Sequence, residues 1–257
     1  MKYAGVLCLT AALLCGAVSA VSAQSYDTLV AQARNEYQSG KLNDAIVSYS
    51  KAIQQRAELP GAYYNREIVY YDLRMMGEAI IDFTKAISLN PDYREAYFNR
   101  ANAYSLESDY PKSVADYSWL IDLPQKDTPD SQVASVYNNR GVAYFKLKQA
   151  DKAIADFDSA AKTNPKYSEA FYNRGNVYYD TGKLTEAAAD FEKAVSLNPA
   201  YRDAYYNLGN VYYRLDDVQK SIADYQKTIS IDKTFADAYY NLGLAYIKLS
   251  EILKKSQ

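Results

Sequence analysis

The sequence contains no histidine, and its two cysteines, Cys8 and Cys15, both lie in the first sixteen of its 257 residues. Without histidine, Ser-His and Cys-His nucleophiles, imidazole acid–base catalysis and the usual His/Cys zinc sites are excluded. Glycine (10) and proline (7) are modest, so this is not a low-complexity chain. Basic residues do not exceed acidic ones, 29 against 31, so no basic field indicates a nucleic-acid partner.

The first 23 residues have the composition of a cleaved secretion signal. Lys2 precedes a run from 4 to 17 that is apolar or small except for Thr10, and Val21-Ser22-Ala23 presents small residues to a signal peptidase. We expect cleavage after Ala23 and a periplasmic or secreted protein. An uncleaved membrane anchor is the alternative, but the apolar run is short of the roughly 20 residues that span a bilayer.

Tyrosine is the abundant residue, with 28 copies, and a 34-residue repeat explains its distribution. The repeat units begin at Tyr26, Pro60, Arg94, Ala134, Ser168, Arg202 and Ala236. The step between the third and fourth units is 40 residues, which indicates an insertion of six, and the seventh unit stops after its first half.

Each unit carries two amphipathic patterns. Positions 4, 8 and 11 are large, small and tyrosine in most units, and positions 20, 24 and 27 are small, aromatic and small; proline closes three units at position 32. Both spacings are i, i+4, i+7, so each unit is predicted to form two helices. Gly40 and Gly182 fall between them, where a tight turn is needed.

These positions resemble the tetratricopeptide repeat family from about Tyr26 to the C-terminus, and unit one fits least, with Glu36 at the tyrosine position. The resemblance implies an all-α fold, a right-handed superhelical solenoid of antiparallel helix pairs, whose concave groove binds peptides or proteins. It implies no enzymatic activity and no cofactor. Members that clamp a terminal carboxylate use basic groove residues, which this chain replaces with acids at position 2, so that clamp is absent and a partner with some positive charge is favoured. Those acids are Glu95, Glu169, Asp203 and Asp237.

The predicted organisation is therefore a signal peptide (1–23), units one to three (26–127), an inserted loop (128–133), and units four to six with a C-terminal half unit (134–257). The insertion is rich in proline, aspartate and serine, and we expect it to loosen the stack between units three and four. Ala236 to about Lys255 should form one capping helix. Its apolar Leu249, Ile252 and Leu253 leave room for weak self-association.

A helical wheel leaves positions 2, 5, 6, 9, 12 and 13 of the first helix outside the core. An arc exposed only for solubility would be Lys and Glu, but here it is Tyr and Asn. Asparagine offers a donor pair and an acceptor that match a peptide backbone, and tyrosine adds apolar area with a polar tip. The candidate groove residues are Tyr64, Asn65, Asn99, Asn102, Asn139, Tyr172, Asn173, Asn176, Tyr179, Tyr206, Asn207, Asn210, Tyr213, Tyr240 and Asn241. We expect the main anchor of a partner in units five and six.

Two further charged series are interpreted as facing water. The position-7 arginines should have half-buried stems and solvated heads, and the position-23 aspartates should form a solvated stripe. The arginines are Arg66, Arg100, Arg140 and Arg174, and the aspartates are Asp116, Asp156, Asp190 and Asp224.

The sequence thus predicts a non-enzymatic, exported scaffold that binds a protein or an extended peptide, with no nucleic-acid or metal partner. Two alternatives stay open. In the first, the groove residues are only those typical of the family, and the asparagines form hydrogen bonds with the neighbouring helix and bind no partner. In the second, the chain is a ligand-binding accessory of a transport or envelope-assembly system.

Overall fold

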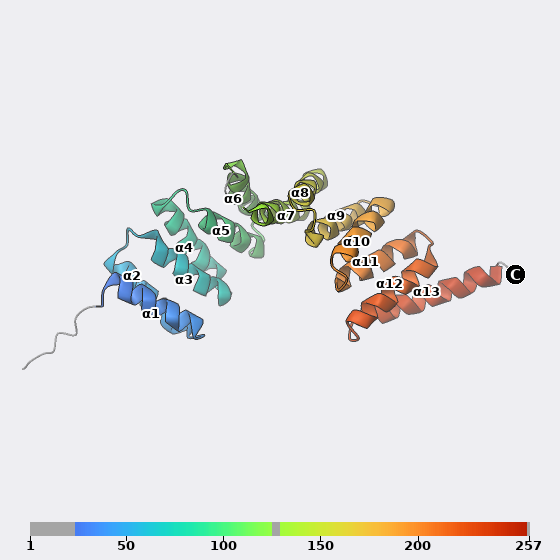
Figure 1. Cartoon of the computed structure of the whole chain (residues 1–257), viewed down its shortest axis with the longest axis horizontal. Helices are drawn as coiled ribbons and strands as arrows, with labels where there is room; N and C mark the ends of the chain where they lie inside the picture. The colour runs from blue at the N-terminus through green and yellow to red at the C-terminus, as the bar shows by residue number, and fades with distance from the viewer. Residues whose placement is uncertain (1–23, 125–128, 256–257) are drawn as a thin grey trace, which may run out of the picture.

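The structure, a computed structural model, describes residues 24–124 and 129–255. In these ranges the chain forms thirteen α-helices and no strand, arranged as an open arch (Figure 1). The predicted signal sequence, 1–23, lies outside the described residues, so cleavage after Ala23 stays a prediction. None of the described helices is both long and apolar enough to cross a membrane.

Each unit is a pair of helices, as the repeat spacing predicted. The first helices are α1 (Tyr26–Gln38), α3 (Pro60–Asp72), α5 (Arg94–Leu106), α7 (Asp130–Lys146), α9 (Ser168–Asp180), α11 (Arg202–Arg214) and α13 (Ala236–Lys255). The second helices are α2 (Leu42–Gln55), α4 (Met76–Leu89), α6 (Tyr110–Asp122), α8 (Ala150–Thr163), α10 (Leu184–Leu197) and α12 (Val218–Ile231). The predicted C-terminal helix is confirmed over its whole length.

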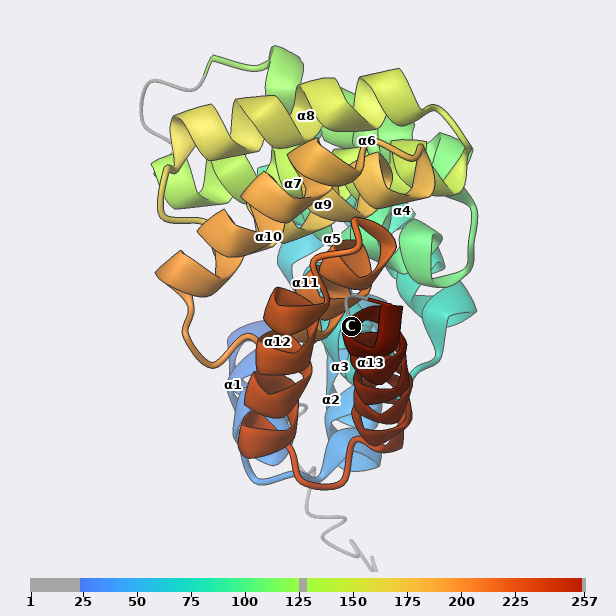
Figure 2. The same cartoon turned by 90° about the vertical axis from the view of Figure 1, so that its right-hand side faces the viewer.

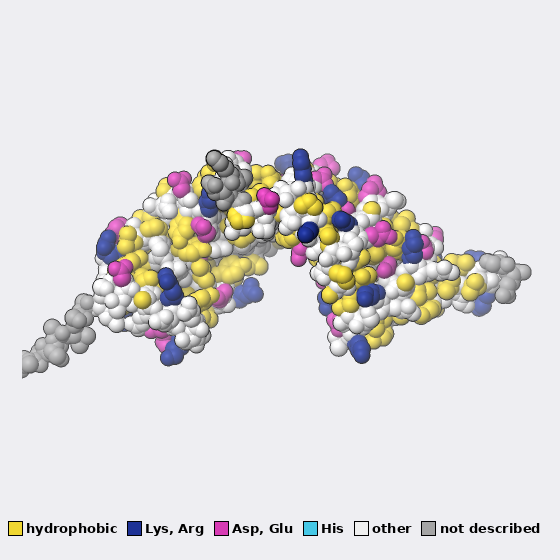
Figure 3. Space-filling view, in the orientation of Figure 1, with side chains coloured by type: hydrophobic (Ala, Val, Ile, Leu, Met, Phe, Trp, Pro, Cys, Tyr) yellow, Lys and Arg dark blue, Asp and Glu magenta, His cyan; other side chains and the backbone are white. Residues whose placement is uncertain are grey.

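The first helices form the inner layer of the arch. Several of them contact the first helix of the next unit, whereas no comparable contact joins second helices in the described ranges. Figure 2 shows the same order, with α8 above α7 and α9. The inner, concave surface is therefore built from first helices, and the space-filling view shows the arch hollowed on that side (Figure 3).

The turn inside each unit needs one residue in the left-handed conformation. Gly40 and Gly182 have φ of 74° and 79°, as their placement in the turn predicted. The four other complete units hold a non-glycine residue there, with φ between 60° and 63°: Arg74, Ser108, Lys148 and Asp216. Hydrogen bonds that close the helix end, such as Met75 N to Tyr70 O at 2.9 Å across Arg74, hold these residues in a conformation that their side chains disfavour.

Aromatic rings of the second helices pack onto the backbone of the first. A Cβ atom added at Gly175 would lie 2.8 Å from the ring of Phe191, so only glycine lets the two helices approach this closely. The same relation holds for Gly141 with Phe157 at 2.9 Å and for Gly209 with Tyr225 at 2.7 Å. The small residues at position 8 are thus set by the ring at position 24.

Glu67 occupies this position in unit two. Its side chain is fully buried, and neither carboxyl oxygen has a hydrogen-bond partner among the described residues. Burial, together with nearby Asp82, raises the pKa of Glu67 to about 11, so the carboxyl group is neutral at physiological pH.

The insertion differs from its prediction. α7 begins at Asp130, so residues 130–133 of the predicted loop 128–133 are helical; residues 125–128 lie outside the described ranges. Packing continues across this junction, because Val136 lies against the buried cluster of Tyr117 and Leu120. The contacts between α6 and α7 therefore do not show the looser packing that was expected between units three and four.

An arginine–aspartate pair links the two helices of four units. In unit four, Nε and Nη2 of Arg140 donate to the two carboxylate oxygens of Asp156 at 2.8 Å each, and Nη1 donates to Ser118 Oγ of unit three at 3.0 Å. The rings of Tyr137 and Tyr144 lie 5.9 and 5.6 Å from this guanidinium. The same three contacts join Arg66 to Asp82 and Ser50, Arg100 to Asp116 and Thr84, and Arg174 to Asp190 and Asp158.

The interpretation of both charged series as solvated was wrong. The paired aspartate side chains are 4 to 9 % exposed and the arginine side chains 14 to 20 %. A helical wheel treats each helix separately, so it cannot show that positions 7 and 23 meet across the helix pair.

Unit six has the aspartate without the arginine. Leu208 stands at position 7, and Asp224 is half-buried. Burial, together with nearby Glu192, raises the pKa of Asp224 from 3.8 to about 7, against an opposing effect of Lys220.

Replacing Leu208 by arginine should supply the missing link. In the wild type, the raised pKa means that this group's contribution to stability is greatest below pH 3.8 and is lost as pH rises to about 7. Leu208→Arg should lower the pKa of Asp224 and remove this pH dependence, so that stability at pH 8 relative to pH 4 rises by about 1–3 kcal/mol over that of the wild type. The loss of the packing of Leu208, which is 4 % exposed, is the same at both pH values.

Urea unfolding from pH 4 to 8 measures both effects. Leu242→Arg is the matched control, because Leu242 stands at position 7 of the half unit, where the described chain has no position-23 acid. Equal pH profiles for the wild type and Leu208→Arg would contradict the link.

Candidate binding surface

The predicted groove residues lie on the first helices of units two to seven. All fifteen are half-buried except Tyr240, which is 69 % exposed. They come from one face of α3, α5, α7, α9, α11 and α13, so the repeat brings them together along the concave surface.

Hydrogen bonds between units use the amide nitrogens of the position-6 asparagines. Nδ2 of Asn207 donates to Asn176 Oδ1 at 2.8 Å and to Tyr172 OH at 3.3 Å, both in the preceding unit. Nδ2 of Asn241 makes the same pair of contacts, with Tyr206 OH at 2.9 Å and Asn210 Oδ1 at 3.1 Å.

The ladder continues toward the N-terminus with one contact per step. Nδ2 of Asn99 donates to Tyr64 OH at 3.3 Å, that of Asn139 to Asn102 Oδ1 at 3.3 Å, and that of Asn173 to Asn138 Oδ1 at 2.9 Å. Asn65 makes no such bond within the described ranges, because unit one has Val30 and Arg34 at positions 5 and 9. The ladder therefore begins at unit two.

The tyrosines at position 5 are held by aromatic neighbours on two sides. The ring of Tyr172 lies 5.8 Å from Phe191 and 4.7 Å from Tyr201. Burial raises the pKa of Tyr172, so its hydroxyl stays protonated. It accepts from Asn207 and keeps its own proton to donate.

The asparagines thus divide their polar atoms between two roles. The donors bond the neighbouring unit, as the generic interpretation required. In contrast, no hydrogen bond inside the described ranges uses the Oδ1 atoms of Asn207 and Asn241. The amide donors of the position-6 asparagines are therefore not available to a partner, and neither are the Oδ1 atoms that already accept a hydrogen bond, those of Asn102, Asn139, Asn176 and Asn210. For the remaining Oδ1 atoms and the tyrosine hydroxyls, the groove interpretation stays a prediction.

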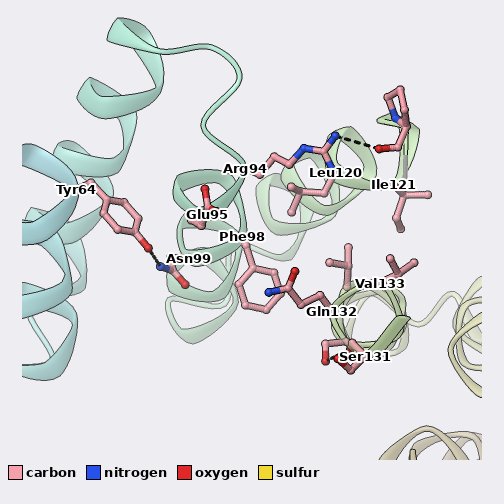
Figure 4. A pocket seen from close by; sticks show the side chains of 13 residues that line it. Tyr64, Arg94, Glu95, Phe98, Asn99, Leu120, Ile121, Ser131, Gln132 and Val133 are labelled. Carbon is pink, nitrogen blue, oxygen red and sulfur yellow. Dashed lines mark hydrogen bonds between the residues drawn. The ribbon is translucent and has the colours of Figure 1, made fainter. Parts of the chain in front are cut away.

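A cavity of about 660 Å³ opens where the insertion occurs, between α3, α5, α6 and the extended start of α7 (Figure 4). Phe98, Leu120 and Val133 form an apolar wall, and the Asn99–Tyr64 hydrogen bond lies at one edge. Of the residues that line this cavity, only Tyr64 and Asn99 were among the predicted groove residues. The six-residue insertion was the sequence feature that indicated the cavity, but it was interpreted as a loop.

Units five and six, where we expected the main anchor, have a smaller hollow. It measures about 100 Å³ and is lined by residues that include Tyr179, Asn210, Tyr213 and Asn241. Both hollows lie on the predicted surface, and the larger one lies nearer its N-terminal end.

Charge on this surface is acidic in places. Glu95, Glu169 and Asp237 are exposed, whereas Asp203 is paired with Arg202. Within the described ranges there is no group of three acidic, histidine or cysteine side chains that could hold a metal ion.

Comparisons with known proteins agree with this architecture. Family models described as TPR repeat match residues 33–73 and 175–216, and models described as tetratricopeptide repeat match 61–93, 134–167, 203–235 and 224–255. A search of curated proteins found no match.

Several solved structures are similar. YrrB, described as a TPR protein with an unusual peptide-binding site, is 22% identical with a TM-score of 0.58, over 75% of this chain and 96% of that one. PilF of Pseudomonas aeruginosa is 12% identical with a TM-score of 0.66, over 84% and 95%. A tetratricopeptide repeat protein from Parabacteroides merdae is 19% identical with a TM-score of 0.60, over 86% and 84%. These likenesses concern the fold alone.

Removing one rung of the ladder should cost stability. Asn207→Ala deletes two hydrogen bonds between units and should destabilise the protein by about 1–3 kcal/mol. Asn65→Ala is the control: the same substitution at the same repeat position deletes no such bond, so it should have little effect. Urea unfolding compares them, and equal losses would mean that the bonds contribute nothing.

Proposed function

The chain belongs to the tetratricopeptide repeat family, and we propose that it is an exported scaffold that binds an extended peptide segment of a protein partner along its concave surface. The observation that carries the proposal is the Asn–Tyr ladder. It lines the inner layer over six units, and it leaves acceptors and hydroxyl protons unused inside the described ranges.

The chemistry of the ladder fits a peptide backbone. An extended chain presents N–H and C=O groups repeatedly along its length; free asparagine oxygens accept from the former and tyrosine hydroxyls donate to the latter. Because the amide donors are fixed by neighbouring units, the ladder is pre-organised, which lowers the entropy lost on binding. YrrB, a protein of similar fold, is described as having a peptide-binding site.

The partner segment should carry apolar and basic side chains. Exposed Glu95 borders the cavity with Phe98, Leu120 and Val133, so the cavity accepts an apolar side chain that has a positive charge beside it. The exposed acids Glu169 and Asp237 extend the same preference along the surface.

Selection from a phage-displayed library of random ten-residue peptides tests this function. We expect enrichment of apolar and basic sequences, and the affinity of the selected peptides should fall about tenfold in Glu95→Lys, because an attraction becomes a repulsion. Glu78→Lys, the same exposed charge reversal on the outer helix α4, should bind like the wild type. A selection without enrichment, or equal affinities for the two variants, would contradict the proposal.

A small-ligand role is the second candidate, favoured by the cavity's volume, which lies in the range of small-molecule sites. Thermal shifts with small solutes, in a protein that enriches no peptide, would support it.

Export rests on the first 23 residues, with Lys2, the apolar run and the Val-Ser-Ala ending. The protein recovered after expression with its own leader should begin at Gln24, as determined by N-terminal sequencing. A protein that still begins at Met1 would rule out cleavage.

A further inference from the structure

The last described helix, α13, exposes an apolar face. Tyr240 is 69 % exposed, Ile247 is 59 % and Tyr246 is 47 %. No helix follows α13 in the described ranges. Figure 2 looks onto this end of the arch, where α12 and α13 stand in front of the other helices.

Each earlier unit covers this face with its own second helix. The tyrosine or phenylalanine at position 5, which is Tyr240 in α13, contacts the ring at position 24 of the second helix in units two, three, five and six, with centroids 5.8 to 6.4 Å apart. At position 8, glycine receives that ring in units four to six. Gly243 is the same residue in α13, and a Cβ added there would meet nothing within 4 Å.

A glycine in the middle of a helix lowers the stability of that helix, and at Gly243 no ring contact offsets the loss. We therefore interpret Gly243 as a site where a large side chain of an antiparallel helix can pack. The exposed apolar side chains around Gly243 independently indicate that another helix covers this face.

The second helices show what such a helix contains. Its core stripe is small, large and small at i, i+4 and i+7, as in Ala187, Phe191 and Ala194 of α10, all three fully buried. α13 carries this pattern on its own exposed face, in Gly243, Ile247 and Ser250. The helix is therefore complementary to itself.

We propose that two copies of the chain pair through α13 in antiparallel orientation, each placing Ile247 on Gly243 of the other. The same register sets Tyr240 of each copy on Ser250 of the other and overlaps the helices along nearly their whole length. The α13 helix of the second copy then occupies the place that the second helix fills in each of the six complete units. Like those second helices, it runs antiparallel to the helix that it covers.

Charge supports this orientation. Asp237 lies in the first turn of α13, and Lys254 and Lys255 lie in its last turn, so antiparallel pairing brings opposite charges together at both ends. Helix dipoles also favour it. A head-to-tail filament is disfavoured, because the outer face of α1 at the other end of the arch exposes Thr28, Ala31 and Asn35, which do not match an apolar surface. The pair is closed and two-fold symmetric.

Analytical ultracentrifugation of the full chain tests the pairing. The wild type should show a reversible dimer, and Ile247→Lys should weaken it at least tenfold, because each interface would then bury two lysines. Ile81→Lys is the control, since Ile81 is a similarly exposed residue (68 %) on the outer helix α4. A wild type that stays monomeric at all accessible concentrations would overturn the proposal. So would a monomeric wild type whose α13 binds a helix of another protein.

Cysteine cross-linking tests the register. In a chain with Cys8→Ser and Cys15→Ser, the pair Tyr240→Cys and Ser250→Cys should form disulfide-linked dimers under mild oxidation. The two sites are about 15 Å apart within one helix, too far for a bond inside one copy. Ala236→Cys with Ser250→Cys lies on the same face, four residues out of register, and should cross-link at least tenfold more slowly. Equal rates for the two pairs would overturn the register.

Discussion

A buried arginine–aspartate pair is the interaction that fixes the geometry of units two to five, the middle of the stack. Each guanidinium holds a carboxylate of its own helix pair with two parallel hydrogen bonds and reaches the preceding unit with its third nitrogen. Such bidentate, charge-assisted contacts fix geometry as well as adding energy. Because the pairs are nearly buried, losing one partner would leave an uncompensated charge in the stack. In units two to five the link therefore fixes both the angle between the two helices and the step from the preceding unit. Unit six, which has Leu208 in place of the arginine, keeps its step through other contacts, including those of Asn207.

A fixed step is what makes the concave surface continuous. The asparagine ladder needs each position-6 amide within about 3 Å of the preceding unit, and it achieves 2.8 to 3.3 Å from Asn99 to Asn241. The donors of these residues thus stabilise the stack, and in the function proposed above the unused acceptors of Asn207 and Asn241 face a partner. Where six inserted residues interrupt the repeat, the packing persists and the surface opens into a cavity instead.

The repeat made much of the fold predictable, and its limits were those of reasoning about one helix at a time. The 34-residue spacing predicted the helix pairs, the turn glycines and the C-terminal helix. It did not predict that Arg140 and Asp156 form an ion pair between the two helices of a unit. It also did not predict that Asp216, which is not a glycine, adopts the left-handed backbone conformation in the turn. At the insertion, proline and serine indicated a loop, yet helix α7 starts at Asp130, where the chain can still pack.

The sequence by itself determined the family, the number of units and which residues share the concave face, because each depends on local periodicity repeated along the chain. Only the tertiary structure decided which atoms of those residues are free. Asn65 and Asn207 occupy the same repeat position, but Asn207 donates to Asn176 and Tyr172, whereas Asn65 lies next to a unit with Val30. Whether a polar group bonds the protein or remains for a partner depends on what the neighbouring unit places within about 3 Å of it, which no single repeat encodes.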